Sequence, residues 1–251
     1  MLFDETVVES IAGSMPVWAA VLMVFISYLG SIYLILPSTI IVYFRKTSWQ
    51  TGTWLGAILG GYGTFTAIKP FFEIPRPIAK NVSTPLAGLA LPLGFEQLHR
   101  FAVELTTPSF PSGHATAMTV FLGLFVTDLD IGTFRRRLTL AIIWIGSVGF
   151  SRVALGTHYI GDILGGILIG IVFLWLVFKL RKKIAIEKWW VLDPGEGILL
   201  LAIMPALATI VGGRIIDGIV LLMGITITFI AHRSLDIRNL DFQELKNKIG
   251  R

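Results

Sequence analysis

The chain has no cysteine and few charged residues. Without cysteine it can form neither a disulfide nor a thiolate metal site, and it has no catalytic thiol. Only 15% of its 251 residues are charged, and the acidic residues form no cluster suited to holding a metal ion. The start, Met1-Leu-Phe-Asp4-Glu5, has no basic residue, so no cleavable signal peptide is expected.

Apolar residues dominate instead. They make up 54% of the chain, and the mean hydropathy is +0.77, which predicts an all-α, multi-pass bundle in the cell membrane rather than a soluble domain. A net charge of +5 also occurs in nucleic-acid-binding proteins. Here the basic residues form short clusters between apolar runs, as in membrane proteins, so no nucleic-acid partner is expected.

A helix needs about 20 apolar residues to cross a bilayer, and the apolar runs predict about seven spans. They cover residues 10–44, 47–68, 114–128, 138–151, 159–178, 197–213 and 215–231. The first run is too long for one span, so its front, to about Phe25, is interpreted as partly interfacial, with a kink at Pro37. The third and fourth spans are short, which predicts a site recessed to about headgroup depth.

The basic residues predict the orientation. Of the 21 Lys and Arg, 15 lie in four groups on one side: 45–46, 135–137, 179–188 and 233–251. The positive-inside rule assigns that side to the cytoplasm, so the N-terminus is expected outside and the C-terminus inside. Anionic lipid heads are a further expected partner of these basic clusters.

Weaker patterns predict local features. Glycines spaced by four predict tight packing, at Gly52, Gly56 and Gly60 and again at Gly161 and Gly165. Arg214 and Asp217 suit a local ion pair, Asn81-Val-Ser83 fits a glycosylation acceptor, and Trp189-Trp190 fits an interfacial aromatic belt. Residues 77–111 are predicted to form an outer loop with an interfacial piece, either a lid over the site or a loop resting on the membrane.

Three separated strings place polar residues at the outer ends of the predicted helices. They are Lys69-Pro-Phe-Phe-Glu-Ile-Pro-Arg76-Pro77, Pro111-Ser112-Gly113-His114 and Ser151-Arg152-Val-Ala-Leu-Gly-Thr-His158-Tyr-Ile-Gly-Asp162. Ionisable residues within membrane proteins are costly and usually functional. Three cations and two histidines suit a phosphate-transfer site without a metal.

His158 and Asp162 are four residues apart, so they share one face of a helix. A carboxylate there accepts a hydrogen bond from one imidazole nitrogen and makes the other more nucleophilic. A structural polar pair would have the same spacing, but the presence of Arg152 and His114 favours a functional pair.

The remaining string residues are candidates for binding phosphate. Ser112 and Gly113 precede a helical run, and backbone N–H groups at a helix start bind anions. Lys69, Arg76 and Arg152 are candidate phosphate clamps, since guanidinium groups match phosphate oxygens bidentately. Lys69 also fits a snorkelling side chain, and Arg76 a surface charge between prolines.

Together the strings resemble the three signature motifs of the type 2 phosphatidic acid phosphatase superfamily. This superfamily includes lipid phosphate phosphatases, polyprenyl diphosphate phosphatases and the soluble vanadium haloperoxidases. The resemblance covers residues 69–162, with every motif position matched in order. It implies a phosphatase-like transmembrane catalytic domain over residues 1–190, with 191–251 as two additional transmembrane helices and a cytoplasmic tail.

The resemblance also implies roles. His158 is expected to be the nucleophile that forms a phosphohistidine, Asp162 to orient it, and His114 to protonate the leaving oxygen and then activate water. The residues expected to hold the phosphoryl oxygens are Lys69, Arg76, Ser112, Gly113 and Arg152. Because fixed cations can stabilise phosphoryl transfer, no metal or other cofactor is expected.

The expected activity is metal-independent hydrolysis of a membrane lipid phosphate or diphosphate on the extracytoplasmic face. Compact, short loops favour a prokaryotic polyprenyl diphosphate phosphatase or a broad lipid phosphate phosphatase. Two alternatives stay open at this point: a phosphotransferase that uses the same site, and a non-enzymatic lipid binder or transporter. A haloperoxidase is disfavoured by the predicted spans. The sequence does not indicate an oligomeric state.

Overall fold

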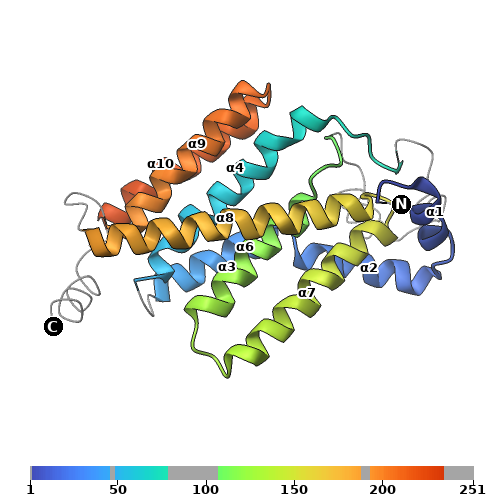
Figure 1. Cartoon of the computed structure of the whole chain (residues 1–251), viewed down its shortest axis with the longest axis horizontal. Coiled ribbons are helices and arrows are strands. Elements are labelled where there is room, and N and C mark those ends of the chain that lie inside the picture. The colour runs from blue at the N-terminus through green and yellow to red at the C-terminus, as the bar shows by residue number, and fades with distance from the viewer. Residues whose placement is uncertain (1, 46–48, 79–106, 188–192, 235–251) are drawn as a thin grey trace.

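The computed structural model describes residues 2–45, 49–78, 107–187 and 193–234. These residues form α-helices and one 3₁₀ turn, with no strand among them, which confirms the all-α prediction for this part of the chain (Figure 1). The helices are α1 (Glu5–Gly13), α2 (Val17–Leu29), α3 (Ile32–Arg45), α4 (Trp54–Phe72), α6 (Gly113–Asp128), α7 (Phe134–Ala154), α8 (Ile160–Glu187), α9 (Pro194–Val211) and α10 (Ile215–Ser234).

By length and composition, five stretches of the described chain could cross a membrane, where the sequence predicts about seven. They are Val17–Arg45, which joins α2 and α3, together with α7, Ile160–Ala185 of α8, α9 and α10. The two predicted spans outside this set are α4 and α6. Helix α6 has only 16 residues, and glycine, threonine and tyrosine interrupt the apolar sequence of the 19-residue α4.

The first apolar run is interrupted at Gly30–Ser31, between α2 and α3. Gly30 allows a close approach there, because a Cβ at this position would lie 2.5 Å from Cγ1 of Val148 in α7. Pro37 lies inside α3, where the expected kink stays a prediction. The expectation of a short fourth span is wrong, because Thr133 caps a helix of 21 residues that begins before the arginines at 135–137.

Helix α4 lies at the centre of the bundle and contacts α3, α6, α8, α9 and α10. Its glycines allow this packing, as the spacing predicts. A Cβ on Gly56 would lie 2.8 Å from the backbone nitrogen of Leu199 in α9, and one on Gly60 would lie 2.8 Å from the ring of Phe173 in α8. The pair α9–α10 therefore packs directly on the helix that carries Lys69.

Several basic residues meet at the end of the bundle where α6 and α8 finish. The Arg181 guanidinium forms two hydrogen bonds to the Asp128 carboxylate, at 2.7 and 2.9 Å. Nε of Arg137 donates to the carbonyl of Val126 at 3.1 Å. Both arginines are buried, so within the predicted lipid-binding clusters these two serve internal contacts. The side chains of Arg135, Arg136 and Lys182 are exposed. Binding of anionic lipid heads to these residues stays a prediction.

The predicted Arg214–Asp217 ion pair is present, with Nη2 and Oδ2 separated by 2.7 Å. Other predictions fall outside the described residues. These are most of the loop over residues 77–111, the acceptor at Asn81, the belt at Trp189-Trp190, and the tail beyond residue 234.

Candidate functional site

The three strings meet at the end of the bundle opposite Arg181, where α4 finishes and α6 and α8 begin (Figure 1). Lys69 lies in the last turn of α4 and Arg152 in the last turn of α7. Arg76 follows α4, Ser112 caps α6, and His158 lies between α7 and α8. The predicted convergence of the strings is therefore observed.

A glycine turn brings His158 back towards the end of α7. Gly156 has a φ of +70°, a left-handed conformation that glycine adopts without strain. The Gly156 N–H donates to the carbonyl of Val153 at 2.9 Å, and the Thr157 N–H donates to that of Arg152 at 3.0 Å. These two bonds define a Schellman motif. The N–H of His158 also donates to the Arg152 carbonyl, at 3.2 Å, so the turn fixes His158 beside Arg152.

Asp162 holds the imidazole of His158. Its Oδ2 lies 3.1 Å from Nδ1 of His158 and accepts the backbone N–H of Tyr159 at 2.9 Å. The second oxygen, Oδ1, accepts the hydroxyl of Ser109 at 3.3 Å. A carboxylate at Nδ1 favours the tautomer with the proton on Nδ1, which leaves the Nε2 lone pair for nucleophilic attack.

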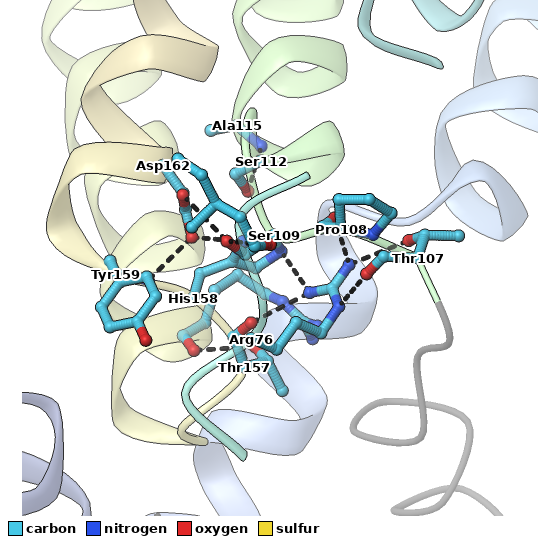
Figure 2. Close-up of polar contacts among 12 residues, drawn as sticks. Arg76, Thr107, Pro108, Ser109, Ser112, Ala115, Thr157, His158, Tyr159 and Asp162 are labelled. Carbon is cyan, nitrogen blue, oxygen red and sulfur yellow. Dashed lines mark hydrogen bonds and ion pairs between the residues drawn. The ribbon is translucent and has the colours of Figure 1, made fainter. Parts of the chain in front are cut away.

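Arg76 lies between two segments of the chain, as Figure 2 shows. Its Nε donates to the carbonyl of Thr107 at 2.8 Å, and Nη2 lies 3.4 Å from the carbonyl of Pro108. On the other side, Nη1 donates to the carbonyl of Thr157 at 2.9 Å and lies 3.0 Å from Nε2 of His158. These partners and its burial exclude a role as a surface charge.

The charge states of Arg76 and His158 follow from their surroundings. Burial lowers the pKa of Arg76 to about 10, which still leaves the guanidinium charged at neutral pH. Burial, and next the positive charge of Arg76, hold the pKa of His158 well below its usual 6.5. His158 is therefore neutral at pH 7, as a nucleophile must be.

Lys69 points into the same region rather than out to the membrane surface. It is 4% exposed, and its Nζ donates to the carbonyl of Pro108 at 2.6 Å. The carbonyl of Ser109 lies 3.4 Å from the same nitrogen. These contacts exclude snorkelling, because a snorkelling lysine extends towards water.

Arg152 is fully buried and only partly satisfied. Its Nη1 donates to the hydroxyl of Ser27 in α2 at 2.6 Å. Its Nε and Nη2 have no hydrogen-bond partner among the described residues. Buried polar groups normally have partners, so these two donors indicate a site for an anionic ligand.

The start of α6 supplies the second string. The hydroxyl of Ser112 accepts the N–H of Ala115, which makes it the N-cap of the helix. Gly113 allows Phe65 to pack closely, since a Cβ there would lie 2.7 Å from that ring. His114 follows in the first turn. Backbone N–H groups and the helix dipole favour an anion at such a helix start.

A cavity of about 270 Å³ joins these groups. From the three strings, the side chains lining it are those of Lys69, Arg76, His114 and His158, together with Gly113. Helices α2 and α3 form another wall, through Ser27, Tyr28, Ser31, Ile32 and Tyr33. A cavity with two histidines and several cations can bind a phosphate group and present it to His158 Nε2.

The residues that hold the cations were not among the predicted site residues. Thr107, Pro108 and Ser109 bind Arg76, Lys69 and Asp162, and they directly precede the second string. Their position next to a string was the only available signal. Ser27 carried no signal, because it lies in an apolar run far from the strings. In the described parts of the chain, no three His, Asp or Glu side chains gather closely enough to hold a metal ion.

Comparison with known proteins gives consistent results. The family model described as the PAP2 superfamily matches residues 50–186. Phosphatidylglycerophosphatase B of Bacillus subtilis (strain 168) is 26% identical over 193 residues, which are 72% of this chain and 84% of that protein.

Two solved structures share the fold. The transmembrane PAP2-type phosphatidylglycerolphosphate phosphatase from Bacillus subtilis has a TM-score of 0.56 at 24% identity, covering 72% of this chain and 85% of its own. Aquifex aeolicus LpxE has a TM-score of 0.53 at 21% identity, covering 69% and 93%. With more than half of its residues matched by the family model, the chain belongs to the PAP2 superfamily.

Proposed function

We propose that the protein is a membrane lipid phosphatase that acts through a covalent phosphohistidine on His158. The observation that carries this proposal is the buried imidazole held between Asp162 and Arg76, at a cavity lined by cations. A lipid-binding protein or transporter needs the cations but has no use for an imidazole oriented in this way. Membership of the PAP2 superfamily supports the same activity.

The proposed first step transfers the phosphoryl group to the enzyme. The lone pair of His158 Nε2 forms a bond to phosphorus, and the bond from phosphorus to the lipid oxygen breaks. The negative charge of the bound phosphate favours the protonated form of His114. The protonated His114 gives that oxygen its proton, so the lipid leaves as an alcohol, or as a monophosphate if the substrate is a diphosphate. Arg76 exchanges its contact with Nε2 for a phosphoryl oxygen, and Arg152 and Lys69 stabilise the charge on the phosphoryl oxygens.

The second step returns the enzyme to its starting state. His114, now neutral, takes a proton from water, whose oxygen attacks phosphorus as the bond to His158 Nε2 breaks. Inorganic phosphate leaves. Asp162 retains its hydrogen bond to Nδ1 throughout and stabilises the positive charge on the phosphorylated ring.

The substrate proposed is a lipid with a terminal phosphate or diphosphate, presented at the extracytoplasmic face. Of the similar proteins named above, two are phosphatases named for phosphatidylglycerol phosphate. The third is LpxE. The preference for polyprenyl diphosphates that the short loops suggest stays a prediction. Phosphate release from phosphatidylglycerol phosphate, phosphatidic acid and a polyprenyl diphosphate, measured side by side, ranks the three.

The decisive experiment is phosphate release by the protein purified in detergent with EDTA present. We expect turnover without added metal, and a loss of at least about a thousandfold in kcat for His158→Ala, because the nucleophile is removed. An acid-labile phosphoprotein should form in the wild type and not in the variant. Turnover that survives His158→Ala in folded protein, or a need for divalent metal, would overturn the mechanism.

A further inference from the structure

The guanidinium of Arg152 has one described partner, and that partner lies outside the strings. The bond runs from Nη1 to the hydroxyl of Ser27, at 2.6 Å. Both side chains are fully buried, and Ser27 belongs to α2, which precedes the residues that the family model matches. The family match therefore assigns no role to Ser27.

Helix packing fixes the position of the Ser27 hydroxyl. Ala20, Val24 and Ser27 are the buried residues of α2 and lie on one face of it. Helix α2 packs against α7, which carries Arg152. Near the end of α2, Gly30 allows the close contact with Val148 of α7 described above. The hydroxyl is therefore held by two packed helices rather than by a loop.

The bond to Nη1 determines which edge of Arg152 is left for a ligand. A guanidinium binds two phosphate oxygens through either its Nη1–Nη2 edge or its Nε–Nη2 edge. Ser27 takes up Nη1. The two donors without a described partner are Nε and Nη2, which are the two donors of the other edge. Ser27 and His158 both line the cavity described above, so the guanidinium bonded to Ser27 lies next to the cavity wall.

We propose that Ser27 is a positioning residue of the phosphate site, which turns the Nε–Nη2 edge of Arg152 towards the phosphoryl group. This inference rests on the proposed function for its effect on turnover, but not for its effect on anion binding. An arginine with a free Nη1 would sample other orientations, and the phosphate would lose one of its two matched hydrogen bonds for part of the time.

The test compares Ser27→Ala with the wild type, using inorganic phosphate as the probe. We expect the variant to bind phosphate about tenfold more weakly, as judged by competitive inhibition of turnover and by phosphate-dependent thermal stabilisation in detergent. Ser27→Thr keeps the hydroxyl and should restore binding. Ser147→Ala is the matched control, because this exposed hydroxyl on α7 bonds only the carbonyl of Ile143 in its own helix.

A double-mutant cycle separates positioning from a general loss of packing. Arg152→Lys has no Nε–Nη2 edge, so adding Ser27→Ala to it should weaken phosphate binding no further. A purely structural role of Ser27 would lower the melting temperature and reduce phosphate affinity equally in both backgrounds. That additive result, or wild-type phosphate affinity in Ser27→Ala, would overturn the inference.

The outcome for Ser27 can be told apart from the outcome for the proposed function. If no lipid phosphate is hydrolysed but inorganic phosphate binds in a Ser27-dependent way, the phosphatase proposal falls and the inference stands. If lipid phosphate is hydrolysed and Ser27→Ala changes neither phosphate affinity nor kcat/KM, only the inference falls. If the wild type binds no phosphate, the inference falls whatever the turnover.

Discussion

At the scale of single residues, His158 is held between opposite charges. Asp162 contacts Nδ1 and favours a positive ring, whereas burial and Arg76 on the Nε2 side favour a neutral one. Burial, and next the guanidinium of Arg76, hold the pKa of His158 well below its usual 6.5 although the carboxylate lies at Nδ1. A phosphoryl group bound to Arg76 would cancel part of the guanidinium charge and so raise the pKa of His158. The pKa of His158 is therefore lower in the free enzyme than in the enzyme with bound phosphate.

This balance predicts the pH dependence of the free enzyme, which kcat/KM reports. A lowered pKa means that His158 loses its proton at a lower pH, so its protonation should reduce kcat/KM only well below pH 6.5. In Arg76→Gln the neighbouring positive charge is absent and the pKa of His158 should rise. The acid limb should then move to higher pH, although the variant is slower throughout.

The substrate phosphate also ionises near pH 6, but it does so alike with both proteins. The informative quantity is therefore the difference between their acid limbs. Coincident limbs in profiles measured from pH 4 to 8 would contradict the assignment of His158 as the group that must be neutral.

At the scale of elements, the face of α4 that meets α9 depends on glycine. Gly56→Ala would place a Cβ 2.8 Å from the Leu199 nitrogen and 3.0 Å from the carbonyl carbon of Ile198. Backbone atoms cannot move aside as a side-chain end can, so the helices must separate. We expect a loss of about 1–3 kcal/mol, measured as a lower melting temperature in detergent.

Gly146→Ala on α7 is the matched control for this packing prediction. Nothing lies within 4 Å of the added Cβ there. Alanine favours helix over glycine, so this variant should be as stable as the wild type or gain up to about 1 kcal/mol. Equal melting temperatures for Gly56→Ala and Gly146→Ala would show that the α4–α9 contact adapts to a methyl group.

The elements also show what the sequence could predict. Apolar runs place α9 and α10 within a few residues of their observed bounds, because each run is long and ends at turn residues. They miss the first turn of α7, because Arg137 there bonds the end of α6 instead of ending the span.

Within the site, the strings supply the histidines, the carboxylate and the cations, since their chemistry is visible in the residue types. The partners of the cations are not visible in this way. Arg76 binds Thr107, which is 31 residues away in the chain, and Arg152 binds Ser27 at a separation of 125. Such pairings depend on the path of the whole chain, and neither Thr107 nor Ser27 has a residue type or spacing that marks it.

At the scale of the whole molecule, the bundle has two chemically distinct ends. The site occupies one, and Arg137, Arg181 and Arg233 lie at the other, around the ends of α6, α8 and α10. We predict that the site end faces outwards, since basic residues favour the cytoplasmic side.

The absence of cysteine makes this orientation measurable. Ser14 is exposed at the site end, where α1 packs on α7, and Asp130 is exposed at the opposite end. In intact cells a membrane-impermeant maleimide should label Ser14→Cys, and should label Asp130→Cys only after permeabilisation. The reverse pattern would place the site in the cytoplasm, and the unlabelled wild type is the background control.

The turn after α7 has a mechanical consequence. The carbonyl of Arg152 accepts both the Thr157 and the His158 N–H, so Arg152 and His158 belong to one hydrogen-bonded piece of backbone. Arg76 comes from a different segment but is bonded to the same turn, because its Nη1 donates to the carbonyl of Thr157 and the N–H of Ile78 donates to that of Gly156. The spacing between Arg152 and His158 is therefore set by the backbone of one short turn, and a distant mutation can shift the two residues only as a unit.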